Sequence, residues 1–194
     1  MDTADADALD RQDMARLLAG EDGALDNLMD RHAPPVFRYL CRMLGNEEDA
    51  NDLAQETFVR VFRARASYRA EQRFTAWLFT IATNLARNQL RWRSRHPNIP
   101  LEAGSESTGP SPGDSLPSNL ANPHQATVAL ERIEAVRAAV RDLPDDMREA
   151  IVLCEWEELA VAEAATVLQS TPKAVEARLY RARKILREQL SRWL

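Results

Sequence analysis

The chain has 194 residues, of which 45% are hydrophobic and 28% charged, and its net charge at pH 7 is −5. This length allows one or two domains, and the presence of only 6 glycines with 6% aromatic residues disfavours a sheet-rich protein. No apolar run approaches the roughly 20 residues that a membrane-spanning helix needs, and the acidic start is unlike a signal peptide. Cys41 and Cys154 lie in apolar helical patterns and are interpreted as buried free thiols, which predicts a cytoplasmic protein.

Positive charge is concentrated in two segments of this acidic chain. Residues 67–95 hold six basic residues and one acidic residue, and residues 172–194 hold seven and two. Each segment closes a helical unit and is flanked by acidic sequence. Two such patches predict two nucleic-acid contacts and at least one protein contact, although solvated charge on helix surfaces is the alternative.

The first 95 residues read as helices throughout. Asn46 is a good N-cap, and the acidic residues that follow it favour the first turn of a helix. A loop is expected at residues 67–73, before a helix that begins at Phe74 and ends in a basic run. The expected helices lie near residues 7–19, 22–32, 35–44 (after Pro34 and Pro35), 47–66 and 74–95.

The middle of the chain changes character, because residues 96–127 are rich in Pro, Ser, Gly and Asn and show no apolar periodicity. This composition is typical of a flexible linker. We therefore expect a first domain at residues 1–95 and a second at residues 128–194.

The second domain is expected to contain helices near residues 128–142, 145–156, 160–168 and 172–190. Pro144 separates the first two, and Asp145 is a candidate cap. The last two helices flank a tight polar turn at Gln169 and Ser170, and the final helix is basic on one face. This layout is a helix-turn-helix, whose second helix lies in the DNA major groove. The fold class is therefore all-α, with two helical domains joined by a flexible linker.

One polar helix face stands out in the first domain. Asp52, Gln55, Glu56 and Arg60 recur at helical spacing and point away from the apolar stripe. Spacing alone favours a solvated face. The functional alternative is a docking face for a basic or polar partner helix, since two carboxylates, an amide and a guanidinium offer directional hydrogen bonds.

The chain resembles the extracytoplasmic-function (ECF) sigma factors of bacterial RNA polymerase. The resemblance depends on two linked patterns, DLAQETFVRVF with FTAWLFTIATNLARNQLRWRSR, and LPDDMREAIVL with EAATVLQSTPKAVEARLYRARKIL. It implies a two-domain sigma factor that binds core polymerase, recognises the −10 and −35 promoter elements and helps to melt DNA. No catalysis, metal or cofactor is expected, and an anti-sigma factor is an expected partner.

The resemblance also implies roles for individual residues. The face of Asp52, Gln55, Glu56 and Arg60 matches the surface that binds the β′ clamp helices, while the β flap is a further expected contact. The first domain meets the −10 element, and its loop at residues 68–73 captures a flipped base. The implied −10 residues are Arg69, Glu71, Gln72, Phe74, Asn84, Arg87, Asn88 and Arg91. The implied −35 residues are Lys173, Glu176, Ala177, Arg178, Tyr180, Arg181, Arg183 and Lys184.

The chain departs from the family at three places in the helix-turn-helix. Many members have a glycine where Gln169 stands, a Gly-Thr pair where Lys173 and Ala174 stand, and a lysine at the position of Glu176. An acid facing DNA repels phosphate but can accept a hydrogen bond from cytosine, so the −35 preference is expected to be unusual.

Two other classes of protein fit the sequence less well. A stand-alone helix-turn-helix regulator explains the last helix, but it explains neither the polar face at Asp52 nor the first basic patch. An enzyme finds little support, because His32, His96 and His124 are scattered and no metal-binding or phosphate-binding motif is present.

Overall fold

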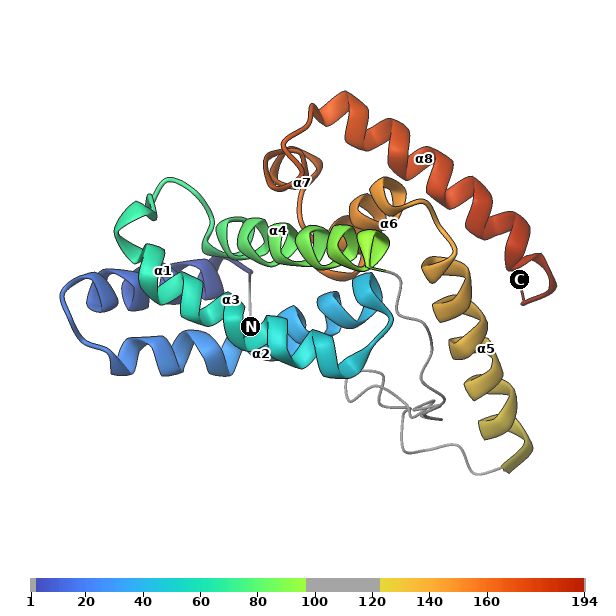
Figure 1. The fold of residues 1–194 in the computed structure, drawn as a ribbon, viewed down its shortest axis with the longest axis horizontal. Helices are drawn as coiled ribbons and strands as arrows, with labels where there is room; N and C mark the ends of the chain where they lie inside the picture. The colour runs from blue at the N-terminus through green and yellow to red at the C-terminus, as the bar shows by residue number, and fades with distance from the viewer. Residues whose placement is uncertain (1–2, 97–122, 194) are drawn as a thin grey trace.

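The computed structural model describes residues 3–96 and 123–193, and all regular structure within these ranges is helical (Figure 1). The all-α prediction is therefore confirmed. The larger part of the predicted linker, residues 97–122, lies outside the described residues, whereas residues 123–127 already belong to a helix. The helices of the first domain are α1 (Thr3–Leu18), α2 (Gly23–Leu44), α3 (Glu47–Ala64) and α4 (Phe74–Arg95), with a short 3-10 turn at Arg65–Ser67.

The second domain begins with a long helix and continues with shorter ones. Its elements are α5 (Pro123–Arg141), α6 (Asp145–Ile151), a π-helical turn (Val152–Trp156), α7 (Val161–Val167), α8 (Pro172–Gln189) and a 3-10 turn (Ser191–Trp193). None of the helices in the described ranges combines the length and the apolar character needed to span a membrane.

Two helix starts follow directly from the sequence. The side chain of Asn46 accepts a hydrogen bond from the amide of Asp49 at 2.9 Å, so the predicted cap of α3 is confirmed. Thr171 caps α8 in the same way, accepting from the amide of Ala174 at 3.2 Å, and Pro172 occupies the first helical position.

Two local predictions were wrong. The break expected at Pro34 and Pro35 is absent, because α2 continues through both prolines. Leu28, Val36 and Leu40 are all buried along one face of α2, so packing of the whole stripe outweighs the lost backbone hydrogen bonds. Asp145 does not cap α6 either.

Pro144 occupies the N-cap position of α6 with no side-chain hydrogen bond. Asp145 is instead the first residue of the helix, and its carboxylate accepts a hydrogen bond from Arg148 at 2.8 Å. The proline therefore ends α5 and starts α6 without help from a side-chain cap.

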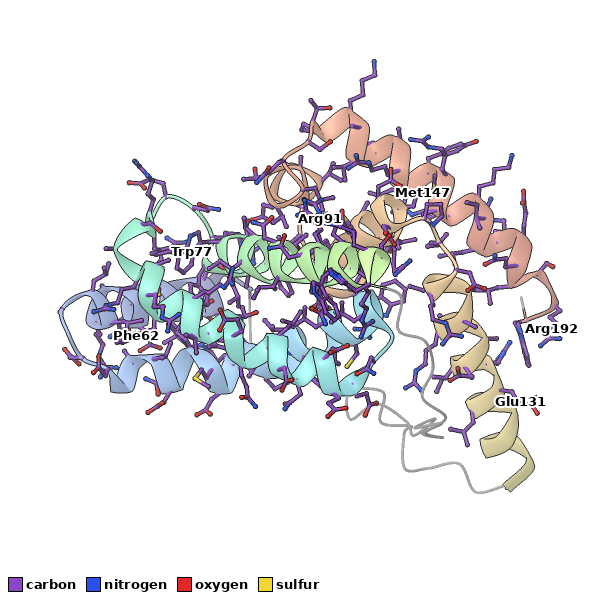
Figure 2. The ribbon with its side chains drawn as sticks, viewed as in Figure 1. Phe62, Trp77, Arg91, Glu131, Met147 and Arg192 are labelled. Carbon is purple, nitrogen blue, oxygen red and sulfur yellow. The ribbon has the colours of Figure 1, made fainter. Side chains whose placement is uncertain are left out.

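Helix α4 lies against α2 and α3 in the core of the first domain (Figure 2). The buried hydroxyls of Tyr39 and Thr83 form a hydrogen bond of 2.7 Å between α2 and α4, and the Tyr39 ring meets the edge of Phe79. This bond satisfies two polar groups that would otherwise be costly to bury.

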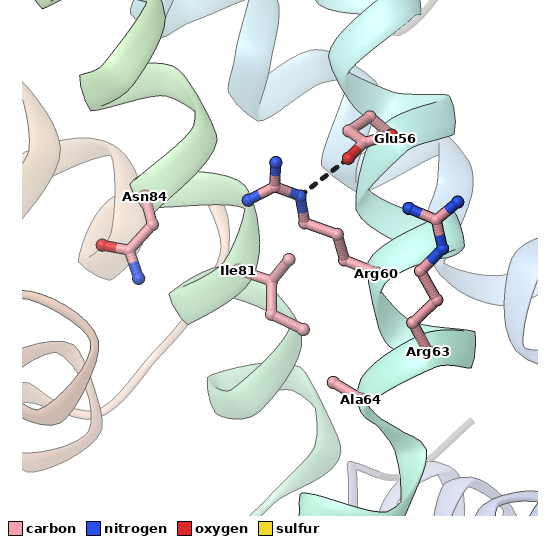
Figure 3. Close-up of a pocket in the computed structure, with 6 residues that line it drawn as sticks. All are labelled: Glu56, Arg60, Arg63, Ala64, Ile81 and Asn84. Atoms are coloured by element: carbon pink, nitrogen blue, oxygen red, sulfur yellow. Dashed lines mark hydrogen bonds and ion pairs between the residues drawn. The ribbon is translucent and has the colours of Figure 1, made fainter.

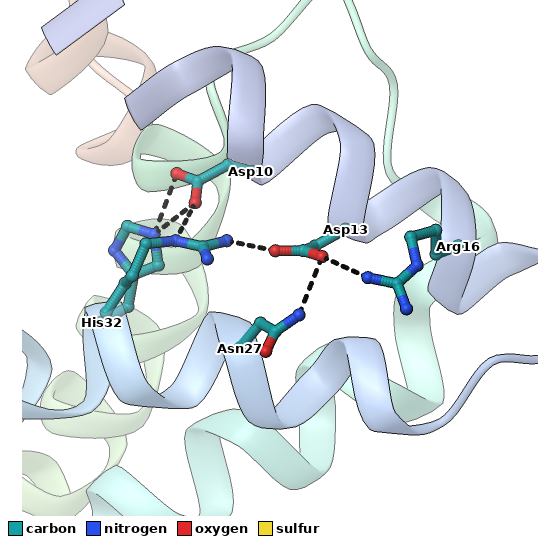
Figure 4. A network of polar contacts seen from close by, with 6 residues as sticks. Asp10, Asp13, Arg16, Asn27 and His32 are labelled. Carbon is teal, nitrogen blue, oxygen red and sulfur yellow. Dashed lines mark hydrogen bonds and ion pairs between the residues drawn. The ribbon is translucent and has the colours of Figure 1, made fainter. Parts of the chain in front are cut away.

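A polar network fixes α1 on α2 (Figure 4). Asp10 is 1% exposed, and its carboxylate meets Nε2 of His32 at 2.9 Å and Nε of Arg31 at 3.0 Å. Asp13 accepts hydrogen bonds from Arg31 at 2.7 Å and from Asn27 at 3.2 Å. The two carboxylates thus add polar contacts to the apolar packing of Met14 and Leu17 on this face of α1.

The two domains are in direct contact. Helix α7 packs on α4, and α5 and α6 pack on α2, so α4 lies between the rest of the first domain and the helix-turn-helix (Figure 1). The residues predicted to bind DNA on α4 are therefore close to the second domain.

Candidate protein and nucleic-acid interfaces

The polar face of α3 is open to solvent. Asp52, Gln55 and Arg60 are exposed and Glu56 is partly exposed. Nε of Arg60 donates to Oε1 of Glu56 at 2.8 Å, an ion pair one helical turn apart. Val59 lies between these residues and is 41% exposed, so the face combines polar groups with an apolar centre, as protein interfaces commonly do.

A shallow pocket of about 480 Å³ joins this face to α4 (Figure 3). Ile81 and Ala64 give it an apolar wall, and the guanidinium groups of Arg60 and Arg63 give it positive charge. Asn84 of α4 lies on the opposite side. Two residues predicted for protein binding, Glu56 and Arg60, and one predicted for −10 DNA, Asn84, therefore line one depression.

The loop between the 3-10 turn and α4 is held from inside. Tyr68 is 8% exposed, its hydroxyl donates to the carbonyl of Gln72 at 3.0 Å, and its ring packs against Trp77. Arg69 and Glu71 are exposed at the tip, as a base-binding role requires, and Gln72 is half-buried.

The predicted role of Phe74 needs correction. Phe74 is 1% exposed and packs against His32, Tyr68 and Trp77, because it begins the apolar stripe of α4. It supports the loop from beneath and does not line its surface.

The remaining predicted −10 residues extend along α4. Asn84 and Arg87 are partly buried, whereas Asn88 and Arg91 are exposed. Arg91 donates to Oδ1 of Asn88 at 2.8 Å and to the backbone carbonyl of Arg87 at 3.2 Å, so the Arg91 side chain is held against its own helix.

The helix-turn-helix keeps its tight turn without a glycine. Gln169 adopts the left-handed conformation with φ of 52°, and the amide of Ser170 donates to the carbonyl of Ala165 at 2.9 Å. On α8 the predicted −35 residues are exposed apart from Arg178, which is partly buried, and Tyr180 is 71% exposed. The predicted set on α8 is Lys173, Glu176, Ala177, Arg178, Tyr180, Arg181, Arg183 and Lys184.

Two cations of α8 already have acidic partners in their own domain. Arg178 forms an ion pair with Asp146 at 3.2 Å, and Arg183 pairs with Glu155. Within the described part of the chain, the side chain of Arg181 donates only to the carbonyl of Ala177 on its own helix. Its charge therefore faces solvent.

Comparison with known proteins decides the family. Residues 28–96 match Sigma-70 region 2, and residues 133–186 match Sigma-70 region 4. The RNA polymerase sigma-H factor of Pseudomonas aeruginosa is 30% identical over 91% of each chain, and the ECF RNA polymerase sigma factor SigW of Bacillus subtilis is 31% identical over 88% of this chain and 91% of its own. The chain belongs to the ECF sigma factors of RNA polymerase.

This sigma factor is a transcription initiation factor that directs RNA polymerase to specific promoters. Its fold is similar to that of CnrH, solved in complex with the cytosolic domain of CnrY, with a TM-score of 0.69 and 27% identity over 94% of this chain and 97% of CnrH. The resemblance inferred from the sequence is thus confirmed at the level of family, fold and function.

Sequence reasoning missed the residues that join the two domains of the sigma factor. Glu149 pairs with Arg87, Glu163 with Arg73, and Arg148 donates to the carbonyl of Met43 at 3.0 Å. One signal was available, because Arg148 and Glu149 are adjacent charges that directly precede the apolar run at residues 150–153. Arg148 is 9% exposed and Glu149 is 4% exposed, and charged residues buried to this extent normally have charged or polar partners.

The two thiols are free and partly buried. Burial raises the pKa of Cys41 to about 11 and also raises the pKa of Cys154, so both thiols stay protonated near neutral pH. Within residues 3–96 and 123–193, no group of three or more His, Cys, Asp or Glu side chains could hold a metal ion.

Proposed function

We propose that α3 of this sigma factor docks on core RNA polymerase through Asp52, Gln55, Glu56 and Arg60. The observation that supports this assignment is the exposed polar face around Val59, which is continuous with the pocket beside α4. A partner helix laid along α3, as the β′ clamp helices would be, could bury Val59 while its polar groups meet the Glu56–Arg60 pair. Contact with the β flap is part of the same proposal, by resemblance to the family.

The promoter contacts follow the two basic patches. In this proposal the loop tip at Arg69, Glu71 and Gln72 receives a base flipped from the −10 element, and Asn84, Arg87, Asn88 and Arg91 meet the adjacent DNA. The exposed face of α8 enters the major groove of the −35 element, where Arg and Lys side chains can contact guanine edges or phosphates.

An inhibitory partner belongs to the same proposal. CnrH was solved in complex with a partner, the cytosolic domain of CnrY, and this similarity supports a protein partner for the present chain, for which the family resemblance implies an anti-sigma factor. Such a partner would compete with polymerase for the sigma factor in the cytoplasm, where the promoter DNA is.

The polymerase assignment is tested by combining Gln55→Ala with Glu56→Ala. We expect core affinity to fall by about tenfold or more, because interface hot spots typically contribute more than about 1 kcal/mol. A matched control combines Gln12→Ala with Asp30→Ala, which also removes one amide and one carboxylate from exposed helix positions. Equal core affinity for the two double variants, measured by fluorescence anisotropy with labelled sigma factor, would refute the assignment.

A further inference from the structure

A pair of stacked aromatic rings lies exposed at the end of α4. The rings of Trp92 and His96 have their centroids 5.0 Å apart, with an angle of 23° between their planes. Nδ1 of His96 donates to the backbone carbonyl of Trp92 at 3.0 Å, and this bond fixes the orientation of the imidazole ring. Both residues are exposed, and Trp92 keeps 49% of its surface accessible. The pair is therefore a preformed flat surface that a ligand can reach.

The position of this pair on α4 connects it to the proposed −10 surface. An exposed tryptophan alone is ordinary, and aromatic pairs four positions apart can serve only to stabilise a helix. Here, however, Asn84, Asn88, Trp92 and His96 follow one another at four-residue steps, so they form one row along the helix. The first two residues of this row are proposed −10 contacts. The aromatic pair thus continues the same surface.

Arginine side chains lie along one side of the row. Arg91 and Arg95 directly precede Trp92 and His96, and both arginines are exposed. Among residues 3–96 and 123–193, the guanidinium group of Arg95 has no ionic partner, and α4 itself carries no acidic residue. Flat rings beside free guanidinium groups are the combination with which proteins bind unpaired nucleic-acid strands, because rings stack on bases and cations meet phosphates.

The row is long enough to meet more than one nucleotide. His96 lies 12 positions after Asn84, which corresponds to about 18 Å along a helix. Neighbouring nucleotides of a stacked strand are about 3.4 Å apart, so the two ends of the row are separated by about five nucleotides. The aromatic pair therefore reaches a different nucleotide from the one that Asn84 would contact.

We propose that Trp92, supported by His96, is a stacking platform for one unpaired base of the melted promoter strand, and that Arg95 meets a neighbouring phosphate. This inference rests on the proposed DNA role of α4. Stacking depends little on base identity, because every base has a π-face. The platform therefore stabilises the open strand without adding sequence preference, whereas Asn84 and Asn88 can read base edges.

The test measures binding of the reconstituted holoenzyme to a fluorescent promoter fragment whose −10 strand is unpaired. Trp92→Ala should weaken binding by about tenfold, because loss of one base–aromatic stack typically has an effect of this size. Trp92→Phe should keep most of the affinity, whereas Trp92→Leu, which is apolar but has no π-face, should bind as weakly as the alanine variant. Equal affinities of the phenylalanine and leucine variants would overturn the proposal. Leu130→Ala removes an exposed apolar side chain from α5 and is the matched control.

Removal of single bases identifies the stacked nucleotide. Abasic nucleotides are placed one at a time through the unpaired strand, and each probe is bound to wild type and to Trp92→Ala. At one position the abasic site should weaken wild-type binding by about tenfold and leave binding of the variant unchanged, because the variant has no stack to lose. If every abasic site has the same effect on both proteins, Trp92 stacks on no base and the proposal is wrong.

A protein contact is the other role that an exposed aromatic pair could serve. The affinity of Trp92→Ala for core polymerase should therefore equal that of wild type, with circular dichroism as the check that the variant is folded. A fall in core affinity as large as the fall in DNA binding would assign Trp92 to a protein interface and overturn the proposal.

Failure of this inference can be told apart from failure of the proposed function. Asn88→Ala and Arg91→Ala are assayed on the same unpaired probe. Unchanged binding by both variants refutes the −10 role of α4 itself. Weaker binding by either one, together with unchanged binding by Trp92→Ala, refutes only the stacking role of the aromatic pair.

Discussion

Glu157 and Arg42 face each other across the boundary between the two domains, with Oε1 and Nη1 3.7 Å apart. The carboxylate is nearly enclosed, with 4% of its side chain exposed, and the Arg42 guanidinium also lies over the ring of Trp156. Burial raises the pKa of Glu157 to about 7, and the neighbouring charges of Arg42 and Arg38 lower it only in part. At this distance the ion pair does not offset the cost of burying the charge.

This arrangement predicts a pH-dependent stability. Between about pH 4.5 and 7 the folded protein binds more protons at Glu157 than the unfolded chain does, so its contribution to the free energy of unfolding falls as pH rises. Glu157→Gln should therefore be more stable than wild type by on the order of 1–3 kcal/mol at about pH 8, and the gain should shrink toward about pH 5. Urea unfolding at both pH values measures this difference in the free energy of unfolding, with Glu131→Gln as the exposed control. A gain independent of pH would contradict the argument.

Substitution of Gln169 should also change the stability of the protein. Its left-handed backbone, with φ of 52°, is costly for a residue with a Cβ atom and is ordinary for glycine. Because the side chain of Gln169 is exposed, Gln169→Gly should stabilise the protein by about 1 kcal/mol. Ala162→Gly, at an exposed helical position of α7, should instead cost about 1 kcal/mol. Thermal unfolding of both variants gives the comparison, and destabilisation by both would show that the turn is not strained.

The sequence was sufficient for features that depend on nearby residues. The Asn46 cap, the start of α4 at Phe74 and the turn before Thr171 all arise from contacts within a few positions, and the structure agrees with them. Motif order was specific enough to predict the family. The all-α class followed from composition and helical periodicity.

Features that depend on distant partners could not be predicted in the same way. Periodicity places Arg87 on a polar face of α4, but its partner Glu149 lies 62 positions away in the chain. Phe74 was assigned to the −10 surface by resemblance to the family, although its neighbours Tyr68 and Trp77 enclose it. The prolines of α2 suggested a break because their local cost is visible in the sequence, whereas the packing that offsets it is tertiary.

Arg181 and Lys184 of α8 should have different effects on −35 recognition. Loss of a base contact by Arg181→Ala should lower transcription by about 5- to 150-fold, which corresponds to about 1–3 kcal/mol, and should relax preference at one base pair. Lys184→Ala should weaken binding to all sequences and reduce the salt slope by about one. Transcription and binding from promoters mutated only in the −35 element separate the two roles. Should Arg181→Ala leave the response to those mutations unchanged, its assignment as a base contact would be wrong.

Removal of the Asp146 charge should have a weaker effect on −35 binding. Its ion pair with Arg178 is partly exposed, with 49% of the Asp146 side chain accessible, so it contributes little energy. Asp146→Asn should free Arg178 and raise affinity for −35 DNA by no more than about fivefold, because exposed pairs contribute up to about 1 kcal/mol. Asp142→Asn, which removes an exposed charge before α6, is the control for net charge. Equal affinities of the two variants would show that Asp146 does not restrain Arg178.

Among the carboxylates of the α1–α2 network, substitution of Asp10 should lower the free energy of unfolding most. Its oxygens serve both His32 and Arg31, and almost no solvent reaches them. Asp10→Asn keeps the shape but removes the negative charge and turns one acceptor into a donor that faces Nε2 of His32, so we expect a loss of about 2–4 kcal/mol in the free energy of unfolding. Asp5→Asn, exposed on the same helix, should change it by less than about 0.5 kcal/mol. Urea unfolding distinguishes them, and a similar small effect of both substitutions would mean that α1 is held by apolar contacts instead.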